Sequence, residues 1–230
     1  MYLYETHCHT SPVSACARAN VFETLDFYKS RGYDGVFITN HFIDSNIGMD
    51  KSESYETKIR FFFHDYEQAV LYGEKIGIKV FDGVEFSHQG TDFLVYGLHK
   101  DWYLAHPEIM DMPIVDRLAF LREHGGYVVH AHPFREAGYI DYIRLLPRSI
   151  DAVEGINANR TAHENRMAQV YAQEYGFPVT AGSDNHVAHR QKWLAGMFSD
   201  KLIDTVEDFI AGMKNRQFSI FEQGVIENEK

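Results

Sequence analysis

Cysteine is scarce in this chain of 230 residues, with only Cys8 and Cys16 present. Two cysteines cannot build a disulfide framework, so the composition predicts a protein of a reducing compartment, the cytoplasm. Long apolar runs are also missing, and none approaches the length of a transmembrane helix. The N-terminus has no basic stretch followed by an apolar one, so we expect neither a secretory signal nor a membrane partner.

Positive charge is in short supply as well. The chain has 22 Lys and Arg residues against 33 Asp and Glu residues, and its formal net charge is −11. Proteins that bind long nucleic acids present a basic stripe, so this balance argues against a long nucleic-acid partner. A small phosphorylated substrate stays compatible with the charge, because bound divalent cations would reverse the local field.

Internal repeats, low-complexity segments and linkers are absent too. A hydrophobic content of 45% and an aromatic content of 14% are typical of globular proteins, and the length suits one domain with a full core. We therefore expect a single domain over residues 1–222, followed by a polar tail over residues 223–230.

Short apolar runs alternate with helical patterns along most of the chain. Such alternation predicts a mainly parallel α/β sheet, and seven or so strand–helix units indicate a closed or nearly closed barrel. Strands are expected over residues 2–4, 35–40, 79–87, 92–98, 127–132, 150–156, 177–181 and 193–198. Helices are expected over residues 21–30, 59–76, 114–123, 137–146, 162–175 and 206–216.

Thirteen histidines are many for this length, and their positions carry more information than their number. Because side chains alternate along a strand, His7 and His9 point the same way and Cys8 points the opposite way. Two imidazoles on one face can bind one metal ion. A single His-x-His is weak evidence, since most isolated histidines are ordinary surface or core residues.

Residues of the same ligand type recur where later strands are expected to end. Parallel α/β sheets place their sites at the carboxyl ends of the strands. Imidazole and carboxylate together suit zinc, manganese or iron, and a carboxylate can bridge two ions. The recurring residues are His41, Glu85, His99, His132, Asp184 and His186.

Three arginines follow these strand ends and fall on loops expected to face the site: Arg135, Arg160 and Arg190. A guanidinium group binds phosphate oxygens in a fork, so each is a candidate for substrate binding. The competing interpretation of each arginine is a surface salt bridge.

Taken together, the motifs resemble the polymerase and histidinol phosphatase (PHP) superfamily of metal-dependent phosphoesterases. They occur in the family's order and span nearly the whole chain. As a set they are specific, although each alone is weak. The matching segments are Thr6-His7-Cys8-His9-Thr10, Ile38-Thr39-Asn40-His41, Gly83-Val84-Glu85, Ala131-His132-Pro133 and Gly182-Ser183-Asp184-Asn185-His186.

The resemblance implies a distorted (β/α)7 TIM-like barrel with two or three divalent metal ions at the carboxyl ends of its strands. The first ion would be bound by His7, His9, Glu85 and Asp184. Glu85 would bridge to a second ion, which His99 and His132 would bind. Asp92 is a competing choice for the position of His99, and both stay open.

A third ion would use His41, His186 and one residue from the loop after His9. Family members often have a histidine or an aspartate there, and the nearest candidate in this chain is Cys16. A thiolate is a good zinc ligand, so Cys16 is either a ligand or a small buried thiol. Whether two or three ions bind stays open.

By resemblance, the function is hydrolysis of a small phosphate ester: a phosphomonoester, a nucleotide or a short oligonucleotide. A metal-activated water would attack phosphorus in line, with charge stabilised by the ions. Asp184, Glu85 and His186 are the candidate catalytic residues, with Asp184 or a nearby histidine passing on the proton. The substrate within this class and the oligomeric state stay open.

Two other classes of protein compete with this hypothesis. Amidohydrolase-like barrels, which act on C–N or lactone bonds, also open with His-x-His and carry a late aspartate. They usually bridge their metals with a lysine at a strand end, whereas the candidate here is Glu85. The second class is a non-catalytic, metal-stabilised module, and the nearly complete ligand set argues against it.

Overall fold

The structure is a computed structural model that describes residues 1–224. Residues 225–230, most of the expected polar tail, lie outside the described part of the chain. The first two residues of that tail, Gln223 and Gly224, form the end of the last strand, β10 (Phe218–Gly224). In residues 1–224, no helix is long and apolar enough to cross a membrane.

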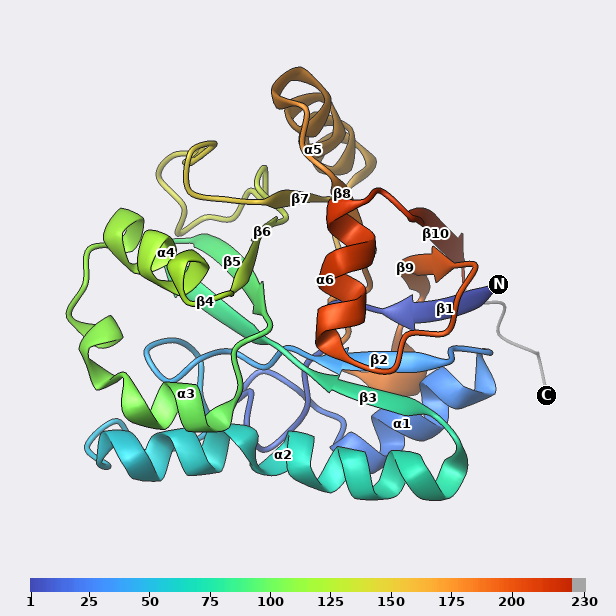
Figure 1. The fold of residues 1–230 in the computed structure, drawn as a ribbon, viewed down its shortest axis with the longest axis horizontal. Helices are drawn as coiled ribbons and strands as arrows, with labels where there is room; N and C mark the ends of the chain where they lie inside the picture. The colour runs from blue at the N-terminus through green and yellow to red at the C-terminus, as the bar shows by residue number, and fades with distance from the viewer. Residues whose placement is uncertain (225–230) are drawn as a thin grey trace.

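The strands form two five-stranded sheets (Figure 1). The first has the order β10-β9-β1-β2-β3, in which β1, β2 and β3 are parallel and β9 and β10 are antiparallel to their neighbours. The second has the order β4-β5-β6-β7-β8, in which β5 runs against both β4 and β6. The other bounds are β1 (Tyr2–Glu5), β2 (Gly35–Ile38), β3 (Lys79–Asp82), β4 (Val84–His88), β5 (Thr91–Tyr96), β6 (Tyr127–Ala131), β7 (Ala152–Asn157), β8 (Val179–Gly182) and β9 (Trp193–Ser199).

The expected closed or nearly closed (β/α)7 barrel is therefore wrong. Within the described residues, only isolated bridges connect the two sheets, between His41 and Glu85 and between Cys8 and Asn185. The decisive local feature is the tight turn of Gln89 and Gly90, where φ is 50° and 82°. Two positive φ values in a two-residue turn give an antiparallel hairpin of β4 and β5, which replaces a parallel strand–helix unit.

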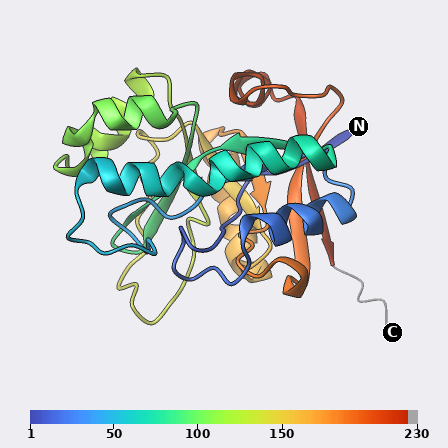
Figure 2. The same ribbon diagram turned by 90° about the horizontal axis from the view of Figure 1, so that it is seen from below.

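Within residues 1–224, six α-helices pack around the sheets. α1 and α2 lie side by side, and α2 packs on β3, whereas α4 packs on β6 and α5 on β7 (Figures 1 and 2). Capping boxes start α1 at Asn20 and α5 at Thr161, and left-handed glycines end α2 at Gly77 and α5 at Gly176. The bounds are α1 (Val21–Ser30), α2 (Tyr55–Ile76), α3 (Lys100–Ala105), α4 (Ile114–Glu123), α5 (Ala162–Tyr175) and α6 (Val206–Lys214).

The helix expected over residues 137–146 does not form, and this segment is an irregular loop. Its large apolar side chains are exposed, Tyr139 by 69% and Tyr142 by 60%. An isolated short helix is marginal in water and needs an apolar face packed on a core, which this segment lacks. We call residues 133–150 the 133–150 loop.

One part of the core lies between the two sheets, and α6 closes it. Phe209 of α6 is fully buried and its ring lies 4.7 Å from that of Phe37 in β2 and 5.2 Å from that of Tyr96 in β5. Because Phe37 and Tyr96 belong to different sheets, Phe209 ties the sheets together although no continuous ladder joins them.

The approach of β8 to the chain after β1 allows no side chain at Gly182. A Cβ atom added there would lie 2.5 Å from the Cβ of His7 and 3.0 Å from its backbone nitrogen. These distances are shorter than van der Waals contact, so the backbone would have to move. The missing side chain at Gly182 thus allows His7 to lie against the end of β8.

We expect Gly182→Ala to lower the free energy of unfolding by about 1–3 kcal/mol, because it overpacks this contact. Urea denaturation of the two proteins measures the change. Gly138→Ala is the control, since a Cβ there meets nothing within 4 Å, and it should shift stability by less than about 0.5 kcal/mol. Equal stability of Gly182→Ala and the wild type would contradict the contact.

Candidate metal centre

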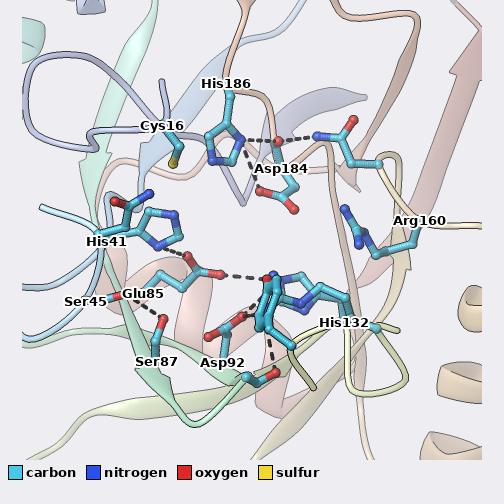
Figure 3. Close-up of a pocket in the computed structure, with 15 residues that line it drawn as sticks. Cys16, His41, Ser45, Glu85, Ser87, Asp92, His132, Arg160, Asp184 and His186 are labelled. Atoms are coloured by element: carbon cyan, nitrogen blue, oxygen red, sulfur yellow. Dashed lines mark hydrogen bonds and ion pairs between the residues drawn. The ribbon is translucent and has the colours of Figure 1, made fainter. Parts of the chain in front are cut away.

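The ends of five strands meet at one edge of the molecule and bring the ligand-type residues together. β1 and β2 are parallel, as are β6, β7 and β8, and the bridges between the sheets are parallel too. The carboxyl ends of these strands therefore face the same way. Figure 3 shows five members of the resulting cluster around a hollow: His41, Glu85, His132, Asp184 and His186. His7 and His9 complete the cluster.

The side chains of His7 and His9 lie together in the cluster, on one face of the chain as their alternation predicts. Their Nε2 atoms are 3.1 Å apart, and both rings are buried. The Oδ1 atom of Asp184 lies 3.5 Å from the Nε2 of His7 and 3.4 Å from that of His9. Three donor atoms of this kind, facing a common point, match the ligand set of a transition-metal ion.

Glu85 stands in the middle of the cluster and is only 1% exposed. Its Oε1 lies 3.3 Å from His7 Nε2 and 3.4 Å from His132 Nε2, and its Oε2 lies 2.6 Å from His41 Nδ1. The 2.6 Å pair lacks hydrogen-bond geometry, so both atoms are buried without a hydrogen bond. Each carboxylate oxygen thus faces a different group of imidazoles, which is the arrangement that a bridging ligand requires.

A third group of ligand atoms includes His9 but not His7. His41 and His186 converge there with His9, and the ring centroids of His9 and His186 are 4.1 Å apart. Cys16 lines the same cavity, and Figure 3 shows its sulfur beside the His186 ring. Burial raises the pKa of the Cys16 thiol, but the imidazoles of His186 and His41 outweigh this and lower it to about 6.

Burial and neighbouring charges shift the pKa values of Glu85 and His9 well below their usual range. Burial raises the pKa of Glu85, but the imidazoles of His41 and His7 outweigh it and hold the pKa well below normal. Burial lowers the pKa of His9, and His186 and His41 lower it further. Glu85 is therefore ionised and His9 neutral, the protonation states in which these side chains bind metals.

A second layer of residues orients the ligands, and Glu154 is its centre. Oε1 of this fully buried carboxylate accepts a hydrogen bond from His7 Nδ1 at 2.8 Å, and Oε2 accepts one from the His132 backbone N–H at 2.9 Å. Such contacts fix the ring that binds the metal. The sequence motifs do not assign a role to Glu154, although a charged residue within the buried strand Ala152–Asn157 is a signal for one.

Backbone strain marks two of the candidate ligands. The φ values of His132 and Asp184 are 26° and 52°, in the left-handed region that residues other than glycine rarely adopt. Strained residues persist where the surrounding structure holds them, and they cluster at functional sites. The hydrogen bond from His132 to Glu154 and that from the Asp184 N–H to the His7 carbonyl, 2.8 Å long, hold these conformations.

The residues present fit divalent metal ions. Three groups of side chains have ligand atoms within 4.8 Å of one another: His7 with His9 and Asp184; His7 with Glu85 and His132; and His9 with His41 and His186. They contain imidazole and carboxylate donors, which suit zinc, manganese or iron. The arrangement can hold cations, while their identity and number stay a prediction.

His99 is the one expected ligand that the structure does not bring to the cluster. It follows the carboxyl end of β5, and because β5 is antiparallel this end points away from the site. His99 Nδ1 instead lies 2.8 Å from Asp82 Oδ2, and its side chain is about half exposed. The amino end of β5 carries Asp92, the competing choice, whose Oδ2 lies 3.8 Å from His132 Nε2.

The three arginines lie in different surroundings. Arg135 and Arg160 line the cavity, and Figure 3 shows the guanidinium group of Arg160 facing it between Asp184 and His132. Arg135 is paired with Asp92 through Nη2 at 2.9 Å. The Nε atoms of Arg135 and Arg160 are both buried and have no hydrogen-bond partner within residues 1–224. Arg190 is exposed at the end of the short 3₁₀-helix Ala188–Arg190 and does not line the cavity.

A family described as PHP-associated matches residues 162–190, which include α5, β8, Asp184 and His186. Among solved structures, a two-domain protein from Bacteroides vulgatus that contains a predicted PHP-like metal-dependent phosphoesterase has a similar fold. Its TM-score is 0.70 at 12% identity over 96% of this chain. The family match is confined to the short segment of residues 162–190, and at 12% identity the structural likeness shows a shared fold. The chain spans 64% of the length of that two-domain protein.

Two further solved structures have a fold similar to that of this chain. PsfC from Pseudomonas syringae has a TM-score of 0.62 at 19% identity, and the match covers 96% of this chain and 91% of PsfC. An amidohydrolase from Chromobacterium violaceum with bound sulfate has a TM-score of 0.54 at 12% identity, covering 95% of this chain and 97% of the other. At these identities the likeness shows a shared fold. No curated protein sequence matches the chain.

The contact of His99 generates a prediction about pH. The hydrogen bond to Asp82 raises the pKa of His99 to about 9, so the charged form stabilises the folded state. This contribution is complete below the unfolded pKa of about 6.5 and is lost as the pH rises through about 9. The stability difference between the wild type and His99→Gln should therefore shrink from pH 6 to pH 10, as measured by urea denaturation.

Metal content measured for His99→Gln provides the control for this placement. Because His99 lies away from the cluster, the variant should bind as many ions per chain as the wild type. Loss of an ion in His99→Gln, or a stability difference that is independent of pH, would contradict the structural role.

Proposed function

We propose that this chain is a metal-dependent phosphoesterase that hydrolyses small phosphate esters. The observation that carries the proposal is one cavity of about 500 Å³ that is lined both by candidate metal ligands and by Arg160, which forms no salt bridge within residues 1–224. Metal ligands together with an arginine form a site for a tetrahedral anion. The fold shared with the Bacteroides vulgatus protein, which contains a predicted PHP-like metal-dependent phosphoesterase, supports the same reaction class.

The proposed ligands follow the three groups of side chains. Glu85 would bridge two ions, and Asp92 would replace His99 beside His132. Cys16 would add a thiolate where His41 and His186 meet. Ions held there would lower the pKa of a bound water and neutralise negative charge on the phosphoryl group.

The chain's own residues would bind the ester and accept the proton that the attacking water releases. Arg160 faces the hollow of the cluster and would donate hydrogen bonds to phosphoryl oxygens. Attack by water on phosphorus releases a proton, and Asp184 and His186 are the proposed groups that hold it. They lie together, with His186 Nδ1 at 2.8 Å from the Asp184 carbonyl and 3.5 Å from its Oδ1.

The proposed substrate is small and phosphorylated rather than a long nucleic acid, because the net charge of −11 disfavours a polyanion. The proposed compartment is the cytoplasm, in which the two free cysteines would stay reduced. No membrane partner is proposed, and the oligomeric state stays open.

Metal removal is the direct test of this function. Protein purified without chelator should contain two or three divalent ions per chain and hydrolyse an aryl phosphate. Chelation should abolish turnover, and re-added zinc, manganese or iron should restore it. Glu85→Gln should lower kcat by at least about 100-fold, because a neutral amide is a poor bridging ligand.

Ion counts and a substrate screen separate the competing outcomes. If Cys16 is a ligand, Cys16→Ser should bind one ion fewer or bind it more weakly. Cleavage of amides or lactones in place of phosphomonoesters would favour the amidohydrolase alternative, whose fold is shared by the Chromobacterium violaceum protein. Full phosphatase activity after complete metal removal would overturn the proposal.

Arg160 and Arg190 allow a matched test of substrate binding. We expect Arg160→Ala to lower kcat/KM for a phosphomonoester by about 10- to 100-fold, since it removes a charged hydrogen-bond donor from the cavity. Arg190→Ala removes the same charge outside the cavity and should have less than a twofold effect. Steady-state kinetics under saturating metal measure both variants, and equal losses would show that the arginines act only through long-range charge.

A further inference from the structure

The wall of the cavity beyond the metal ligands carries an aromatic ring stacked on an arginine. Tyr139, on the 133–150 loop, lines the cavity although its side chain is 69% exposed. The guanidinium carbon of Arg135 lies 5.6 Å from the centre of the Tyr139 ring. This contact covers part of the ring, and the high exposure leaves much of its surface open.

The arginine that supports this ring is itself held in place. Its Nη2 lies 2.9 Å from Asp92 Oδ2 and donates a longer hydrogen bond, 3.4 Å, to the Gly90 carbonyl. Asp92 in turn lies 3.8 Å from His132, a candidate metal ligand. A short chain of contacts therefore fixes the position of Tyr139 relative to the metal centre.

The Tyr139 ring differs in size and polarity from the other uncharged side chains of the cavity wall. The uncharged side chains that line the cavity nearby are the small polar ones of Ser45, Asn46, Ser87 and Asn159. A cavity of about 500 Å³ is much larger than a phosphoryl group, so part of an organic alcohol would also fit inside. A planar ring in that alcohol would find an open aromatic surface at Tyr139.

We propose that the site selects phosphate esters whose alcohol carries a planar ring, such as a nucleoside monophosphate, which stacks on Tyr139. This inference rests on the proposed phosphoesterase function. The phosphoryl group lies at the metal ligands and Arg160, and the ring lies on the open surface of Tyr139. Stacking of this kind tolerates different rings because each offers a π-face.

Two substrates with the same scissile bond test the stacking. Adenosine 5′-monophosphate and methyl ribofuranoside 5-phosphate both release a primary ribose alcohol, and only the first carries a base. The wild type should favour the adenosine ester in kcat/KM by roughly tenfold or more, as expected for one stacked base. Tyr139→Ala should lose this preference, because its kcat/KM for the adenosine ester should fall toward that for the riboside ester.

Tyr139→Phe separates stacking from hydrogen bonding, since phenylalanine keeps the ring and loses the hydroxyl. It should retain the preference for the adenosine ester. Tyr142→Ala is the matched control, because Tyr142 is on the same loop, is 60% exposed and stacks on Arg144 at 4.8 Å, yet does not line the cavity. It should behave as the wild type.

The outcomes distinguish this inference from the proposed function. Equal kcat/KM for both esters in the wild type, or loss of the preference in Tyr139→Phe or Tyr142→Ala, overturns the stacking while leaving the phosphoesterase in place. If neither ester is hydrolysed with metal bound, the proposed function fails for this substrate class. In that case the equilibrium binding of both esters to the wild type and to Tyr139→Ala is measured. Equal affinities of the wild type for the two esters would overturn the stacking.

Discussion

The burial of the Glu85 carboxylate is the constraint on which the site depends. An ionised carboxylate that is 1% exposed would be costly without compensation, and the chain surrounds it with imidazoles. Its two oxygens lie within 3.5 Å of His7, His9, His41 and His132. The nitrogen atoms of these rings point toward the same space. Metal ions bound by both the rings and the Glu85 carboxylate would therefore balance its negative charge. The second layer, centred on Glu154, keeps the rings in that orientation.

The two-sheet architecture decides which residues reach this carboxylate. Parallel strand ends bring histidines from both sheets to one edge, and the bridge between His41 and Glu85 joins the sheets there. β5 runs in the opposite direction to its neighbours, so its amino end lies at the site and places Asp92 there. Its carboxyl end, which His99 follows, lies away from the site. At the far end of the sheets, Phe209 of α6 fills the space between them, so the site is built on a packed scaffold.

The irregular conformation of the 133–150 loop places an aromatic side chain at the cavity. A helix there would have had to pack its tyrosines on the core, whereas the loop presents Tyr139 at the cavity. Arginines attach the loop to the turn between β4 and β5: Arg135 contacts Gly90, and Arg144 contacts Gln89 and Thr91. The hairpin that breaks the barrel pattern therefore also supports one wall of the cavity.

Local patterns in the sequence encode helices and the direction of neighbouring side chains in this protein. The helices over residues 21–30 and 162–175 formed as expected, because their caps and apolar spacing are local signals. The alternation of His7 and His9 placed both rings on one face for the same reason. The hairpin at Gln89 and Gly90 was also a local signal: two strands were expected there without a helix between them, which indicates antiparallel pairing.

The sequence by itself determined the residue types of the site and, for most of them, their position after a strand. It could not determine strand direction across distant pairs, because pairing depends on contacts between residues far apart in the chain. Only the tertiary structure therefore decided between Asp92 and His99 near His132, and between Arg160 and Arg190 at the cavity. It alone also decided the role of Glu154, whose two hydrogen-bond partners, His7 and His132, are distant in sequence and meet only when the sheets pack.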